Sequence, residues 1–227
     1  ASTRRSSDPL GTMGAPIQLA TSVGSQYGGA SNRWGDYFGI QTDPNDDTTF
    51  WAVAMIAGPS GAWQTVVNSF RVTTTVTSAP ASVTKYEGGA VTGALPQITT
   101  SDNAYYRVAS VNVSRTGTVA SHITQFNLTT TNPASLKFKV EAAAASRVTA
   151  NYFLWNWSTN KWEYVGATPL TAADKVWEFQ APNPASKFVN SQRQVRLLLR
   201  AIMPSSSVST AIPFNFRTDQ VQLISQQ

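Results

Sequence analysis

The chain has 227 residues with no cysteine and a single histidine, which excludes a disulfide framework and thiolate metal sites. Charged residues make up only 13%, with 17 Lys and Arg against 12 Asp and Glu, for a net charge of +5. The basic residues are scattered, apart from Arg4–Arg5 and a set between positions 187 and 200. Because nucleic-acid binders concentrate basic residues on one face, we expect no nucleic-acid partner.

The composition also bears on fold class and location. Low charge with much Thr and Val is typical of short strands and polar turns, so we expect an all-β protein. No apolar run approaches the roughly 20 residues that span a bilayer, so no membrane span is expected. The absence of cysteine favours a bacterial exported protein, which predicts an extracellular or cell-surface location.

The first predicted elements lie in the N-terminal third. Residues 1–15 are polar and contain Gly and Pro, which is the composition of a disordered arm. Residues 16–80 are expected to form a small four-stranded antiparallel sheet, because short apolar runs alternate with turns rich in Gly, Pro, Asn and Asp. The predicted strands are Ile17–Val23, Asp36–Gln41, Thr49–Ile56 and Trp63–Val72. The Thr-rich segment 73–84, with Pro80, is the predicted domain boundary.

Residues 81–227 are expected to form a second and larger β domain. Apolar and polar residues alternate over Ser135–Glu141, and in a second segment Val195, Leu197, Leu199 and Ala201 alternate with Arg196, Leu198 and Arg200. Such alternation predicts sheets with one buried and one solvated face. Strands of this kind recur between turn residues, which predicts a jelly-roll-like β-sandwich.

Two stretches resemble known families. The run Asn32–Tyr37, followed by Asp43–Trp51 and Trp63-Gln64-Thr65, resembles the closing blade of secreted bacterial β-propeller proteins. A propeller takes about four to eight blades, so this resemblance implies one blade-like sheet, either the tail of a larger precursor or a reused blade.

The second resemblance covers the C-terminal domain. Pro133–Ala142, Phe153–Glu163 and Asn215–Val221 together resemble the accessory β-sandwiches of large extracellular bacterial proteins, of the galactose-binding or carbohydrate-binding-module kind. The resemblance implies a domain that binds, displays or assembles and does not catalyse.

Catalytic motifs are absent from the sequence. The single histidine, His122, stands in Ser-His-Ile-Thr with no Gly-x-Ser-x-Gly pattern nearby. Carboxylate pairs for glycoside hydrolysis would be Asp36 with Asp43, or Glu141 with Asp219, and neither pair lies in a recognised motif. We therefore expect no enzymatic activity.

The sequence contains two candidate ligand sites, an acidic turn and an aromatic cluster, and each also has a purely structural interpretation. Asp43, Asn45, Asp46 and Asp47 cluster in one turn and offer oxygen ligands for a structural calcium ion, the one cofactor suggested by the sequence. The same side chains also cap turns without metal.

The second candidate is an aromatic cluster. Trp155 and Trp157 are two residues apart and share a strand face, and Trp162 and Tyr164 follow closely, with Phe153 as an extension of the stripe. Exposed coplanar rings would bind sugars, whereas the alternative is that they face the core or a neighbouring subunit.

The expected function is that of a non-catalytic extracellular structural or adhesive protein. Open edges of a blade-like sheet pair readily with another chain, so we expect a homo-oligomer or a polymer such as a fibre or surface layer. One alternative is a carbohydrate-binding module that holds glycans on the aromatic platform. The other is a viral jelly-roll coat protein, for which Arg4 and Arg5 supply little charge to neutralise RNA.

Overall fold

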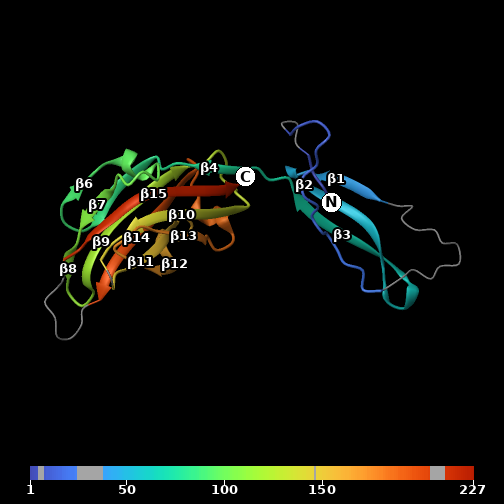
Figure 1. Cartoon of the computed structure of the whole chain (residues 1–227). Helices are drawn as coiled ribbons and strands as arrows, with labels where there is room; N and C mark the ends of the chain where they lie inside the picture. The colour runs from blue at the N-terminus through green and yellow to red at the C-terminus, as the bar shows by residue number, and fades with distance from the viewer. Residues whose placement is uncertain (5–7, 25–37, 146, 205–212) are drawn as a thin grey trace. The chain divides into compact units, whose positions relative to one another are not determined.

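The computed structural model describes residues 1–4, 8–24, 38–145, 147–204 and 213–227, without the side chains of 46–48 and 60. The chain divides into two compact units, Ala1–Thr73 and Thr74–Gln227 (Figure 1). No helix in the described part is both long enough and apolar enough to cross a membrane. The predicted class is confirmed: both units are built from antiparallel strands.

The first unit contains a three-stranded sheet of order β1-β2-β3. Its strands are β1 (Gly39–Asp43), β2 (Asp46–Ala57) and β3 (Trp63–Arg71), and a short 3-10 turn, η1 (Pro59–Gly61), joins the last two. The predicted fourth strand over Ile17–Val23 is wrong. Its backbone reaches only single partners, such as the Val23 N–H on the Ala57 carbonyl and the Asn68 amide on the Leu19 carbonyl, so no ladder forms.

Two predictions fall partly outside the described residues. Residues 32–37, which carry the first part of the blade resemblance, are not described. No second blade is present in the described part of the chain. In the arm, the Ala1 amino group donates to the Ile17 carbonyl at 2.6 Å, and the Ile17 N–H donates back to the Ala1 carbonyl at the same distance. The described part of the arm is therefore bound to its own chain.

The second unit is a sandwich of two six-stranded sheets (Figure 1). The β10 sheet has the order β13-β10-β15-β7-β6, with β4 paired to β15, and the β11 sheet has the order β12-β11-β14-β9-β5, with β8 paired to β9. The elements are β4 (Thr75–Ser78), β5 (Ser82–Glu87), β6 (Val91–Thr92), η2 (Leu95–Ile98), β7 (Tyr106–Ala109), β8 (Val111–Val113), β9 (Gly117–Asn127), β10 (Ser135–Ala143), β11 (Thr149–Asn156), β12 (Lys161–Pro169), β13 (Lys175–Gln180), η3 (Ala185–Phe188), β14 (Gln194–Pro204) and β15 (Asn215–Gln226).

The segment predicted as the domain boundary, 73–84, supplies strands to both sheets of the second unit, which begins at Thr74. β4 pairs with β15, and β5 pairs with β9 in the opposite sheet, so the chain changes sheet around Pro80. A Thr-rich stretch with one proline is compatible with edge strands as well as with a linker.

The core lies between the two sheets and follows the predicted alternation. Leu136, Phe138 and Val140 of β10 are fully buried, as are Leu197 and Leu199 of β14. Successive side chains of a strand point to opposite faces, so the residues between these core residues form the outer face of each sheet.

Candidate functional site

The outer face of the β11 sheet carries the aromatic residues singled out from the sequence. Tyr152 and Leu154 of β11 point into the core cluster, so their neighbours Phe153 and Trp155 point outward. We call this outer surface the aromatic face. Strand register arranges its side chains in three rows that run across the strands.

The first row combines indole rings with an arginine. Trp162 lies opposite Trp155, and Arg196 and Gln125 lie opposite each other on the next strands. The rings of Trp155 and Trp162 meet edge to face, with centroids 5.1 Å apart and an interplanar angle of 75°. These rings are not coplanar, so the flat platform expected from the sequence is replaced by an edge-to-face packed layer.

The second row is apolar. It runs from Tyr164 through Phe153, Leu198 and Ile123 to Thr84. Phe153 and Tyr164 pack edge to face at 5.5 Å. Leu198 is only 3% exposed although it lies outside the core cluster, so neighbouring side chains of this outer face shield it from solvent.

Tyr86 shows how this cover is made. It occupies a bulge in β5, between Lys85 and Glu87, and its ring lies 6.3 Å from that of Trp162 in β12. β5 and β12 are opposite edges of the β11 sheet, roughly 19 Å apart if four strand spacings were flat. Two side chains standing on a flat sheet do not bridge that separation, so the two edges curve toward each other over Leu198.

The third row is polar. Arg200 of β14 donates two hydrogen bonds to the Glu87 carboxylate, at 2.5 and 3.1 Å, and its strand neighbours are Asn151 and Ser121. The Ser121 hydroxyl accepts from the Glu87 N–H at 2.8 Å, which fixes the bulge of β5. Aromatic rings and hydrogen-bonding groups therefore lie side by side on one face.

Trp157 lies just past the end of β11 but joins the same layer. The Asn156 side chain accepts from the backbone N–H groups of Ser158 and Thr159, which forms the turn into β12. The Trp157 ring then lies 6.3 Å from that of Trp155 and 4.9 Å from the Arg196 guanidinium carbon. The buried indole N–H groups of Trp155 and Trp157 have no acceptor in the described part of the chain.

An ion pair borders this face. The Lys187 ammonium lies 2.8 Å from the Glu163 carboxylate, which also accepts from Asn156 at 3.1 Å. The hydrogen bond from Lys187 is the main reason that the pKa of Glu163 lies below its usual value. Glu163 therefore stays ionised at neutral pH, and its charge is matched locally.

The predicted calcium turn is described only in part. Asp43 accepts from the Asn45 N–H at 2.9 Å and from the Trp51 indole N–H at 2.8 Å. Asp43 thus caps its own turn, as the alternative interpretation holds. The side chains of Asp46 and Asp47 lie outside the described residues, so the calcium site there stays a prediction.

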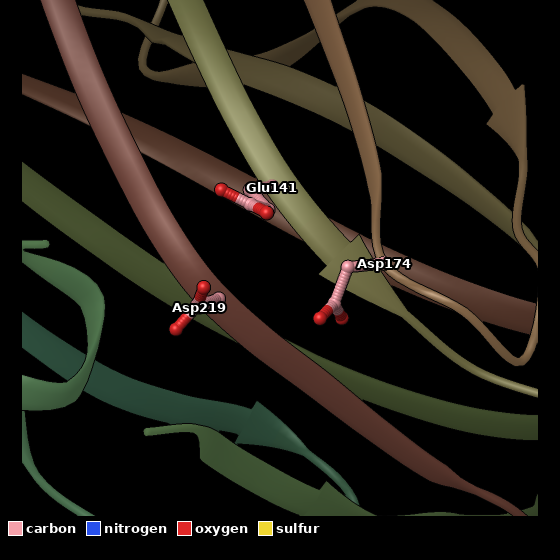
Figure 2. A group of neighbouring side chains, drawn as sticks. All are labelled: Glu141, Asp174 and Asp219. Carbon is pink, nitrogen blue, oxygen red and sulfur yellow. The ribbon is translucent and has the colours of Figure 1, made fainter. Parts of the chain in front are cut away.

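A different acidic cluster lies on the β10 sheet. Glu141 of β10, Asp219 of β15 and Asp174 just before β13 place carboxylate oxygens within 4.8 Å of one another (Figure 2). Asp219 is 1% exposed and sits at the register shift of β15 against β10. This brings together the Glu141–Asp219 pair considered from the sequence, but burial keeps a sugar substrate away from Asp219.

The surroundings of Asp219 in this cluster disfavour its ionised form. Burial is the main reason that the pKa of Asp219 is raised, and like-charge repulsion from Glu141 and Asp102 raises it further. Hydrogen bonds from backbone N–H groups lower the pKa but do not offset these effects. The Tyr105 hydroxyl donates to one Asp174 oxygen at 2.5 Å, while the other, buried Asp174 oxygen has no partner among the described residues. Carboxylates are the ligand type of Ca²⁺, and one oxygen from each of these three residues would supply three of the roughly six to eight oxygens that the ion takes.

We expect Asp219→Asn to stabilise the protein at pH 7 in a buffer containing EDTA. The amide keeps an oxygen for the Asp102 N–H and removes a buried charge beside Glu141, so the melting temperature should rise by about 2–4 °C. Differential scanning calorimetry measures this change. Glu178→Gln, which removes an exposed carboxylate paired with Lys137 on the same sheet, is the control and should change little. A lower melting temperature for Asp219→Asn would contradict the prediction.

His122 is a core residue and not part of a catalytic group. It lies on the inner face of β9, stacked on Phe216 at 5.5 Å, and its Nε2 atom lies 2.9 Å from the Thr218 hydroxyl. Complete burial lowers the pKa of His122 to about 3, so the ring is neutral at physiological pH.

No protein-family model matches the chain, and no curated protein matches it. One similar solved structure is a family 61 carbohydrate-binding module in complex with beta-1,4-galactotriose, at 8% identity and a TM-score of 0.36, covering 66% of this chain and 86% of that one. A family 4 carbohydrate-binding module is 13% identical at a TM-score of 0.39, over 66% of this chain and 94% of that one.

A third similar structure is the enzymatically active domain of tailspike protein 4 from bacteriophage CBA120, at 10% identity and a TM-score of 0.38. That match covers 67% of this chain and 19% of the tailspike chain. The second unit is thus a β-sandwich that resembles carbohydrate-binding modules at low sequence identity.

Sequence reasoning missed three residues of the aromatic face. Arg196 and Leu198 alternate with buried leucines in the sequence, which assigns them to an outer face but gives no sign of aromatic neighbours. Nothing in the sequence near Tyr86 assigns it to the aromatic face. Its position depends on a bulge in β5 and on contact with Trp162, which lies 76 residues later in the sequence.

Proposed function

We propose that the second unit is a non-catalytic carbohydrate-binding module and that the aromatic face holds the glycan. The observation that carries this proposal is the continuous layer of rings from both edges of one sheet, bordered by a polar row. Tyr164 and Tyr86 are 57% and 49% exposed, so about half of each side chain is accessible to a ligand.

The chemistry of the face suits a sugar. Exposed ring faces pack against the apolar C–H surface of a pyranose, and the polar row supplies hydrogen bonds to its hydroxyl groups. The unpartnered indole N–H groups of Trp155 and Trp157 add two donors whose burial without an acceptor is costly. Small adjustments of the edge-to-face rings would offer these donors to ligand hydroxyls.

Affinity gel electrophoresis against a panel of soluble plant, bacterial and animal polysaccharides tests this function. We expect retardation by at least one polysaccharide, and Tyr164→Ala and Tyr86→Ala should each weaken that binding by about threefold to tenfold, since aromatic stacking is worth about 0.5–1.5 kcal/mol. Val176→Ala, which removes a half-exposed apolar side chain from the β10 sheet, is the matched control. Unchanged migration on every polysaccharide would refute the proposal.

Self-assembly outside the cell stays a second candidate function. One face of the three-stranded sheet exposes Trp51, Val53, Trp63 and Val67, and Val53 lies opposite Val67. An apolar strip of this kind favours association with further copies. Light scattering on the full chain measures the mass directly, and a strictly monomeric mass at the highest soluble concentration would exclude this function.

A further inference from the structure

Arg196 is the one charged side chain of the three rows without an opposite charge beside it. Arg200 and Glu87, the other two, pair with each other. No carboxylate of the described residues lies within salt-bridge distance of the Arg196 guanidinium. The rows therefore carry one unmatched positive charge, at the centre of the first row.

The guanidinium of Arg196 is held in place by two contacts. Its Nε–H donates to the Gln125 side-chain oxygen at 3.2 Å, and its carbon lies 4.9 Å from the Trp157 ring centroid. Neither contact uses the two terminal nitrogens, and those make no hydrogen bond to the described part of the chain. Arg196 thus presents a preorganised fork of N–H donors beside the indole rings.

A carboxylate fits this fork. Planar guanidinium and carboxylate groups form two parallel hydrogen bonds, and hydrogen bonds between charged partners are about twice as strong as neutral ones. A neutral hydroxyl would fill only one donor position and leave the charge unmatched. The indole rings of Trp155 and Trp157 stand next to the fork, so a sugar ring that carries a carboxylate would contact both groups.

We infer that the glycan held by the aromatic face is acidic and that Arg196 pairs with the carboxylate of a uronic acid residue. This inference rests on the proposed function, because it assigns the ligand class of the same face. Arg196 then determines the preference for acidic over neutral glycans, whereas the aromatic rings would contact both kinds of sugar equally.

Matched pairs of polysaccharides test the inference on the full chain. Polygalacturonate is compared with its methyl ester, and glucuronoxylan with unsubstituted xylan, by isothermal titration calorimetry and affinity electrophoresis. We expect the acidic member of at least one pair to bind about tenfold more tightly than its neutral partner. Arg196→Gln should remove that tenfold preference, and Arg196→Lys should restore only part of it because the ammonium lacks the fork.

The control variant addresses the net positive charge of the chain. Arg107→Gln removes the same charge from β7 in the β10 sheet, where Arg107 stacks on Tyr105 at 5.2 Å. It should change the affinity for the acidic polysaccharide by less than about twofold. Thermal melting of both variants checks that the fold is retained.

Three outcomes would overturn the inference. Equal binding of acidic and neutral partners would leave the carbohydrate-binding function in place and remove the acidic specificity. Equal losses in Arg196→Gln and Arg107→Gln, or equally tight binding of dextran sulfate, would show general charge attraction without a carboxylate site. Failure to bind any polysaccharide, acidic or neutral, would refute the proposed function itself.

Discussion

Lowering the pH from 7 to 5 is expected to reduce the free energy of unfolding of the sandwich by about 2 kcal/mol through His122 alone. Burial lowers the pKa of His122 to about 3 in the folded protein, whereas the unfolded chain takes the ordinary value of 6.5. Above pH 6.5 both states are neutral, so stability is full. As the pH falls toward 3, only the unfolded state gains the proton, so stability is lost progressively, to a total of about 5 kcal/mol.

Urea unfolding followed by tryptophan fluorescence at pH 7, 6, 5.5 and 5 measures this slope. Ordinary carboxylates titrate below this range, and the raised pKa of Asp219 acts in the opposite direction, because its protonation at lower pH favours the folded state. The contribution of His122 is therefore the difference in slope between the parent chain and a variant without the histidine. His122→Gln keeps hydrogen-bonding groups toward Thr218 and Thr124 and does not titrate, so its stability should not fall over the same range even if its absolute stability is lower. Equal slopes for the two proteins would show that His122 is not the cause.

The strands of the sandwich could be predicted where burial follows local alternation. In β10, apolar and polar residues alternate, and in β14 they alternate except at Leu198; the structure confirms both strands and their core faces. The alternation rule failed at Leu198, which the pattern places between Arg196 and Arg200 on a solvated face. Leu198 is nevertheless buried, on the face where Tyr86 and Trp162 meet across the sheet, and contacts between distant strands leave no trace in a local period.

Two other features could not be predicted from the sequence, because they depend on pairing between distant segments. Ile17–Val23 has the apolar composition of a strand, but its backbone finds scattered partners, so composition alone did not decide pairing. The acidic cluster on the β10 sheet joins Glu141, Asp174 and Asp219 from three separate segments. The Glu141–Asp219 pair was considered for catalysis, yet neither its close approach nor the burial of Asp219 at a register shift could be derived from spacing.

Leu198→Ala is expected to cost about 2–5 kcal/mol of unfolding free energy, as large as a substitution in the main core, although the residue points away from that core. The reason is that the side chain fills the space under the curved edges of the β11 sheet, beside Phe153 and Ile123. Removing it leaves a cavity under rings that are already packed edge to face. Urea unfolding at pH 7 gives the change directly.

Two companion variants separate the causes of this loss. Leu198→Met keeps the volume and should cost less than about 1.5 kcal/mol, and Val176→Ala, at a half-exposed position of β13, should stay within about 0.5 kcal/mol of the parent chain. Because Leu198 supports the rings proposed to contact the glycan, Leu198→Ala should also weaken polysaccharide binding, whereas Leu198→Met should preserve it. A cost for Leu198→Ala as small as that for Val176→Ala would mean that the two edges of the sheet do not close over this position in solution, and the aromatic face would then be flatter and more open than the contact between Tyr86 and Trp162 implies.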